Sequence, residues 1–151
     1  MRRPAVLPVL LLCAAAGSSQ AAWAALGGTL DTAQAGNAPL RETRRVASHD
    51  GYEVHETVLA SGTVVREFTG PTGLVFAVTW QGPIKPDLNQ LLGIHFSRLV
   101  VAGESPHADH RSLRLRDADL VIESVGKMRA FAGRAYLPAM LPAGVAAGDI
   151  R

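Results

Sequence analysis

Two histidines three residues apart, His107 and His110, offer the clearest metal-binding chemistry in this sequence, and Glu104 and Asp109 lie beside them. Imidazole and carboxylate groups are ligands of Zn²⁺ and Cu²⁺, so this loop could hold such an ion if His49 or a carboxylate completed the shell. The segment lacks the H-E-x-x-H spacing, and its composition is that of an exposed polar loop. A metal-binding protein or small metal-dependent enzyme that uses His107, His110 and Asp109 is therefore the alternative interpretation.

A second pair of charged residues, Glu56 and Arg66, stands on the apolar sides of two predicted strands. If these strands pair, the two side chains can meet as a partly buried ion pair. Such pairs more often serve architecture than catalysis. Glu53 and Glu56 are three apart on a strand and point to opposite faces, so they cannot act there as an acid–base pair.

Trp80 and His95 are the remaining residues for which we predict a binding role, together with Glu56 and Arg66. Trp80 ends an apolar run next to a Gly-Pro turn, where it can present an aromatic face or pack in the core. His95 lies on the apolar stripe of a predicted helix, where it can be a core histidine or line a pocket. Ser61 lacks the G-x-S-x-G frame, and no P-loop, Rossmann fingerprint or EF-hand loop is present. We assign no catalytic residue and expect no cofactor.

The first 24 residues have the order of a secretory signal peptide. Arg2 and Arg3 precede an apolar run at residues 5–16, and Ala22-Trp23-Ala24 is a small-residue cleavage site. The run is too short to span a membrane, which takes about 20 apolar residues. We predict cleavage after Ala24, with a cut after Ala22 as the alternative, and a periplasmic or secreted mature protein.

Cleavage changes the composition of the chain. The single cysteine, Cys13, is removed, so the mature protein of about 127 residues has no disulfide and no thiolate ligand. Removal of Arg2 and Arg3 leaves thirteen basic residues, equal to the thirteen acidic ones. A formally neutral chain argues against nucleic acid as a partner, which requires a net basic face. No transmembrane segment is expected after the signal.

Alternation of apolar and polar residues predicts three strands, at 52–58, 63–69 and 74–80, joined by short turns that contain glycine. The third run is almost continuously apolar, which is typical of a central strand covered on both faces. Residues 25–48 are rich in glycine, alanine and polar residues and are predicted to form a flexible N-terminal segment.

An amphipathic helix is predicted after Pro86, with Asp87 as its cap and an apolar stripe from Leu88 to Leu99. Gly93 within it indicates a close approach to another backbone, or a helix that bends or ends early. An edge strand at 113–116 and a hairpin of 119–125 with 128–137, turning at Gly126 and Lys127, follow.

The predicted fold class is α+β, an antiparallel β-meander with one amphipathic helix packed on the sheet and a C-terminal β-hairpin. The predicted organisation is a signal peptide at 1–24, the flexible segment at 25–48, a single domain at 49–138 and a tail at 139–151.

Three long strings resemble a family of short exported proteobacterial proteins, the domain of unknown function 2844. They are residues 59–68 (LASGTVVREF), 73–83 (GLVFAVTWQGP) and 128–138 (MRAFAGRAYLP), and the resemblance extends to residues 25–28, 86–88 and 91–93. It covers nearly the whole chain and implies no activity, cofactor or catalytic residue. We therefore expect a non-catalytic envelope or secreted binding module whose partner is an envelope protein, a peptide or a glycan.

Overall fold

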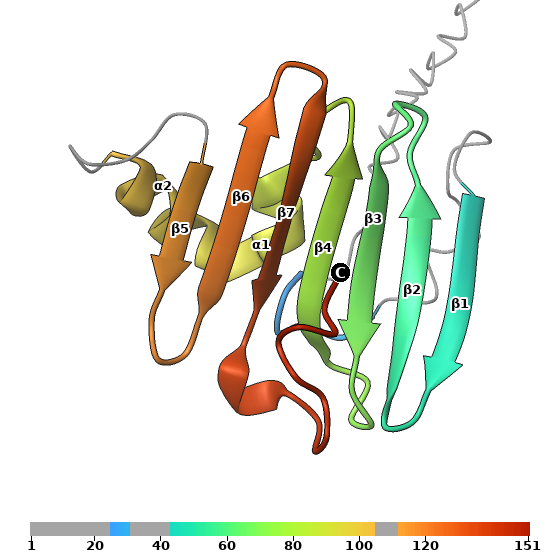
Figure 1. Cartoon of the computed structure of the whole chain (residues 1–151). Helices are drawn as coiled ribbons and strands as arrows, with labels where there is room; N and C mark the ends of the chain where they lie inside the picture. Colours follow the sequence, from blue (N-terminus) through green and yellow to red (C-terminus); the bar gives the residue numbers. More distant parts are fainter. Residues whose placement is uncertain (1–24, 31–42, 105–111) are drawn as a thin grey trace, which may run out of the picture.

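A computed structural model describes residues 25–30, 43–104 and 112–151. They form one seven-stranded sheet in which every neighbouring pair is antiparallel, in the order β1-β2-β3-β4-β7-β6-β5 (Figure 1). The strands are β1 (Thr43–His49), β2 (Tyr52–Val58), β3 (Val64–Thr69), β4 (Val75–Gly82), β5 (Ser112–Arg116), β6 (Val121–Lys127) and β7 (Ala130–Tyr136). The predicted α+β class, with its meander, packed helix and C-terminal hairpin, is confirmed.

Strand β4 is the centre of the sheet, as its continuous apolar run predicts. All six residues from Val75 to Trp80 are buried. A bulge opposite Phe68 and Thr69 shifts the register, so that Phe76 and Ala77 both pack in one core cluster with Ile150. Both faces of this strand are therefore covered.

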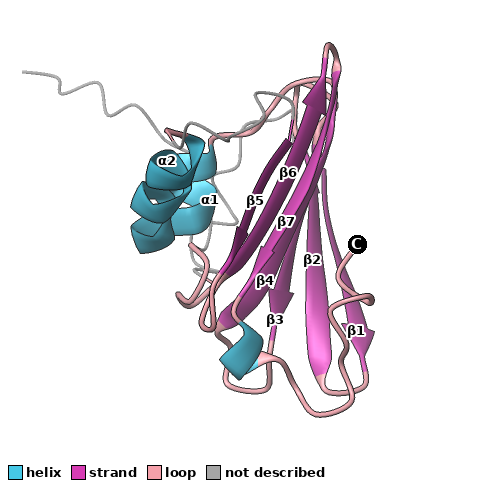
Figure 2. Cartoon of the chain, turned by 60° about the vertical axis from the view of Figure 1, so that its left-hand side comes forward, coloured by secondary structure: helices cyan, strands magenta, loops and turns pink. Residues whose placement is uncertain are grey.

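The connection from β4 to β5 is helical and covers one face of the sheet. It consists of α1 (Leu88–Leu92), a 3₁₀ turn (Gly93–His95) and α2 (Phe96–Gly103). Asp87 caps α1 as predicted, because its carboxylate accepts from the backbone N–H of Asn89 at 2.9 Å and of Gln90 at 3.2 Å. The helices lie on one side of the sheet and the C-terminal tail on the other (Figure 2).

Gly93 interrupts the predicted continuous stripe for a steric reason. Its φ is +54°, and a Cβ at this position would lie 2.6 Å from the Cβ of Ala25. The close approach and the early helix end are thus both observed, and the second half of the apolar stripe belongs to α2. None of the helices in the described part of the chain has the length and apolar character needed to span a bilayer.

The described part of the segment 25–48 is structured, contrary to the prediction of a flexible lead-in. Leu26 is only 2% exposed, and Gly27 donates to the Val75 carbonyl at 2.8 Å. Residues 43–49 form the edge strand β1, although nearly all of its side chains are exposed. A strand that buries neither face needs no apolar alternation, because the backbone ladder with β2 does not depend on apolar side chains.

Two further expectations for the C-terminal region are corrected. The hairpin turns at Met128 and Arg129, where Arg129 has φ +62°, because Gly126 still pairs with Phe131 inside the ladder. The tail is also anchored: Ile150 is 2% exposed, and Arg134 donates to the Ala147 carbonyl at 2.7 Å. A single buried apolar side chain and a hydrogen bond from a distant arginine side chain produce no periodicity in so short a segment, so the sequence did not indicate this anchor.

Candidate functional site

A groove of about 580 Å³ lies between the helices and strands β5, β6 and β7. Its volume lies in the range of sites that bind small molecules, roughly 300–1,000 Å³. Most of its lining side chains are apolar, and a few are polar. They are Lys85, Pro86, Asp87, Leu88, Asn89, Phe96, Leu99, Val100, Gly103, Ser112, Leu113, Ser124, Gly126 and Phe131.

Two glycines line this groove. A Cβ at Gly103, at the end of α2, would lie 3.5 Å from Cδ1 of Leu113. A Cβ at Gly126 would lie 2.9 Å from Cδ1 of Phe131, closer than real side chains come. The α2 helix contributes both a buried residue, Leu99, and the more exposed Val100 to the wall. A side chain at Gly126 would therefore displace Phe131, whereas a Cβ at Gly103 would make only an ordinary van der Waals contact with Leu113.

The polar groups of the groove differ in how far the protein already uses them. The carboxylate of Asp87 accepts the two N–H bonds that cap α1. Lys85 is exposed and makes no ion pair with any residue that the structure describes. The groove thus offers an apolar floor with an available cation at one end.

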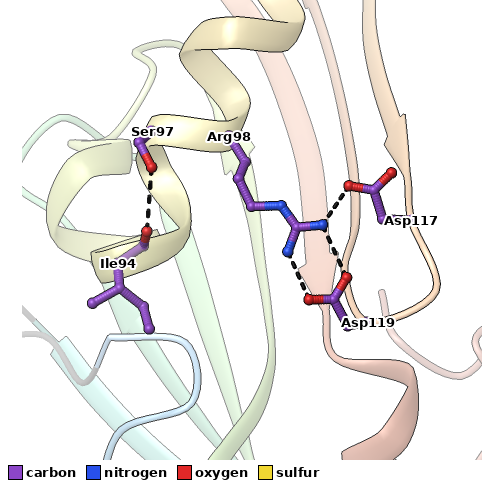
Figure 3. Close-up of polar contacts among 5 residues, drawn as sticks. All are labelled: Ile94, Ser97, Arg98, Asp117 and Asp119. Carbon is purple, nitrogen blue, oxygen red and sulfur yellow. Dashed lines mark hydrogen bonds and ion pairs between the residues drawn. The ribbon is translucent and has the colours of Figure 1, made fainter.

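An ion-pair cluster fixes α2 against the turn between β5 and β6, as Figure 3 shows. The guanidinium of Arg98 donates to both carboxylate oxygens of Asp119, at 2.8 and 2.9 Å, and also to Asp117. In the same view Ser97 donates to the Ile94 carbonyl at 3.5 Å. A planar fork with two carboxylates restrains orientation as well as distance, so this cluster positions the α2 wall of the groove.

His95 lies just before α2 and is half-buried. Its Nε2 would be 3.8 Å from a Cβ at Gly27, so it lies against the N-terminal segment and is not among the lining residues of the groove. Burial lowers the pKa of the imidazole, the Arg98 charge lowers it further, and Asp119 opposes both. A binding role for His95 stays a prediction.

Trp80 is a core residue and does not present a free aromatic face. It is 2% exposed and packs with Val65, Leu91 and other residues of the helix-side cluster. A Cβ at Gly133, opposite it in β7, would lie 2.2 Å from its Cζ2. Of the two interpretations of Trp80, packing is therefore the one that the structure supports.

Glu56 and Arg66 do meet, as the strand pattern predicts. They are direct partners across β2 and β3, and Arg66 Nε donates to Glu56 Oε2 at 2.9 Å. Both side chains are partly buried. The pair lies on the face opposite the helices, so the structure does not bring it together with Trp80 or His95.

The residues of the predicted metal loop, His107, Asp109 and His110, lie outside the described residues. Within residues 25–30, 43–104 and 112–151, no group of three or more potential ligands is close enough to hold a metal ion. The metal-binding alternative stays a prediction that rests on the loop alone.

Nothing in the local sequence pattern indicated the groove. Its wall combines residues 85–103, residues 112–126 and Phe131. Only the packing of α2 on β5 brings these segments together, since a hollow is a property of the distance between elements and not of any one of them.

Residues 22–150 match the family described as protein of unknown function (DUF2844). The chain belongs to this family. No curated protein and no solved structure matches it. The match spans all three described segments except Arg151, so the groove and the Glu56–Arg66 pair both lie within the family region. The family's description assigns no activity, and the function must be argued from the geometry of this chain.

The charges at the β5–β6 end of the sheet predict a loss of stability in acid. Hydrogen bonds from Arg98 hold the pKa of Asp119 below its ordinary value, and those from Arg116 and Arg134 lower the pKa of Glu123. At low pH the unfolded chain therefore binds more protons than the folded chain. The two carboxylates stabilise the folded state fully above their unfolded pKa values, and this stabilisation is lost as pH falls. We expect the free energy of unfolding to decrease from about pH 5 downward.

Urea denaturation over a pH series measures this decrease. The double variant Asp119→Asn, Glu123→Gln cannot titrate at these sites and should flatten the acid limb. Asp50→Asn is the matched control, because Asp50 is exposed in the β1–β2 turn and makes no ion pair with a described residue. An acid limb that is equally steep in the double variant would contradict the assignment.

Proposed function

We propose that this protein is an exported, non-catalytic binding module whose ligand lies in the groove between α2 and strands β5, β6 and β7. The groove itself is the observation that carries the proposal. It is of ligand size, and it is open, mostly apolar and held in shape by the Arg98 cluster. Such a hollow with a few polar groups is the usual form of a binding site.

Charge and apolarity of the lining define the ligand. Leu99, Leu113 and Phe131 offer an apolar surface, and Lys85 supplies a cation whose charge no described residue pairs. The complementary ligand is an amphipathic molecule with an apolar body and an acidic end. Envelope peptides with apolar side chains and a free carboxylate have this chemistry.

Export is the second part of the proposal, and the signal sequence supports it. Leu26, the second residue after the predicted cleavage site, is buried in the core, so the segment that follows the site belongs to the folded domain. We therefore expect protein recovered from the periplasm or medium to begin at Ala25. N-terminal sequencing after expression of the full chain tests this, and an intact N-terminus with Met1 would contradict it.

Binding is tested with 8-anilinonaphthalene-1-sulfonate, which has apolar rings and one anionic group. We expect saturable fluorescence enhancement by the folded, exported protein. Val100→Trp should weaken binding about tenfold or more, because the indole fills the groove. Val101→Trp is the control: it is the adjacent residue of the same type, 68% exposed, and does not line the groove.

Lys85→Gln separates the charge of the site from its shape. Loss of one exposed charge pair should weaken binding of the probe roughly two- to fivefold, and the effect should be smaller at high salt. Equal effects of the two valine substitutions, with circular dichroism showing both variants folded, would overturn the groove as the binding site.

A further inference from the structure

The face opposite the helices carries a row of charged side chains that crosses the whole sheet. Directly opposite residues of antiparallel strands share a face, and the strand registers join seven residues in this way. In spatial order they are Arg45, Glu56, Arg66, Thr79, Arg134, Glu123 and Arg114, here called the arginine row. Figures 1 and 2 place this face on the side of the C-terminal tail.

The arginine row has more positive than negative charge. Glu56 accepts from Arg66, while Glu123 accepts from Arg134 at 2.9 Å and from Arg116 at 2.6 Å. Arg45 and Arg114 make no ion pair with any residue that the structure describes. In a mature chain with equal numbers of acidic and basic residues, this is a local excess of cations.

Arg66 is bound in a way that leaves its donating fork available. Only its Nε is engaged, by Glu56, and its two Nη atoms make no hydrogen bond with a described residue. Two parallel N–H groups match the two oxygens of a carboxylate. Arg134, in contrast, is fully engaged by Glu123 and by the Ala147 carbonyl.

Thr79 supplies an independent observation at the same place. It lies directly opposite Arg66 on one side and Arg134 on the other, and is only 5% exposed. Its Oγ1 has no hydrogen-bond partner among the described residues. A buried hydroxyl without a partner is costly, and a ligand oxygen would relieve that cost.

A hollow of about 290 Å³ lies over these residues and is bounded by Ile150 of the tail. Its charged and hydroxyl lining consists of Arg66, Thr79, Arg114, Arg134, Arg151 and Glu123, and the Glu123 carboxylate is paired with Arg116 and Arg134. We propose that this hollow is a carboxylate-binding site, in which the Nη atoms of Arg66 and the hydroxyl of Thr79 donate to the ligand oxygens. The Thr79 oxygen is shielded from solvent, so side chains around it must shift to let a ligand oxygen reach it. The volume suits a small organic acid or one acidic sugar unit.

The test is a ¹H–¹⁵N NMR titration of the exported protein at constant ionic strength with citrate, D-galacturonate and neutral D-galactose. We expect saturable shifts at β3, β4 and β7 with an acid and none with galactose. The acid that binds more tightly identifies whether the carboxylate comes from a free organic acid or from a sugar. Neither acid should displace anilinonaphthalenesulfonate from the groove on the opposite face.

Two variants should each weaken acid binding about tenfold, since a hydrogen bond to a charged group is lost: Arg66→Gln and the isosteric Thr79→Val. Thr57→Val is the matched control. Thr57 is also buried with an unpartnered hydroxyl, but it lies opposite Val65 and faces the helix side. Both valine variants should melt at or above the temperature of the parent. Absence of saturable shifts, or unchanged affinity in Thr79→Val, would overturn the site.

Discussion

Gly133→Ala is expected to destabilise this protein strongly, although it adds a single methyl group. A Cβ at this position would lie 2.2 Å from Cζ2 and 2.5 Å from Cε2 of Trp80, and 2.7 Å from the Glu123 carbonyl oxygen. Neither neighbour can give way, since one is a core ring that is 2% exposed and the other is backbone of the adjacent strand. We expect a loss of at least about 3 kcal/mol in the free energy of unfolding, measured by urea denaturation.

The double variant Trp80→Phe, Gly133→Ala identifies the cause. Phenylalanine has no atom at the position of Cζ2, so it removes the shortest contact with the indole and leaves the clash with the carbonyl. The two changes should therefore couple, with the double variant less destabilised than the sum of the single ones. Gly148→Ala, where a Cβ meets no atom within 4 Å, should cost almost nothing. Strict additivity would show that the strand separation adjusts instead.

Gly93→Ala is also expected to destabilise the protein strongly, for two reasons that can be separated. Its φ of +54° and ψ of −126° lie in a region that essentially only glycine adopts. Its new Cβ would also meet the Cβ of Ala25 at 2.6 Å. Together the backbone strain and the clash should cost about 3 kcal/mol in the free energy of unfolding.

Ala25→Gly in the Gly93→Ala background removes the second atom of the clash and should recover part of the loss. Gly73→Ala measures the cost of a positive φ for alanine without a clash, because Gly73 has φ +75° and no atom lies within 4 Å of its added Cβ. If Ala25→Gly recovers nothing, the N-terminal segment does not pack on α1 in solution. The experiment therefore also checks whether the first residues of the predicted mature chain belong to the core.

The two faces of the sheet have different chemistry. Under α2 the groove is mostly apolar with an exposed lysine, while the opposite face carries the arginine row and a hydroxyl without a described partner. The two proposed sites can therefore fail independently, because they share no lining residue. Val100→Trp and Thr79→Val each address one face only.

Much of the fold was predictable from short-range pattern. The alternation in β2 and β3, the apolar run of β4 and the capping position of Asp87 each depend on residues only a few positions apart. Strand β1, the tail anchor at Ile150 and the hairpin turn were missed. An exposed edge strand needs no apolar side, a single anchor has no period, and the turn residue Arg129 carries no turn signature.

The candidate sites show the same division. The meeting of Glu56 with Arg66 was predictable, since two strands joined by a short turn have few possible registers. The continuation of the row through Thr79, Arg134 and Glu123 was not predictable. Strand β7 pairs with β4 only after the chain has passed through α2, β5 and β6.

By itself the sequence determined the α+β class, the family resemblance, and the local partners of Glu56 and Asp87. Only the tertiary structure decided that Trp80 is core and where the groove and the arginine row lie. The physical reason is that periodicity records which side of an element is buried, whereas a site depends on the distance between elements. That distance is set here by close approaches such as Gly133 on Trp80 and Gly93 on Ala25.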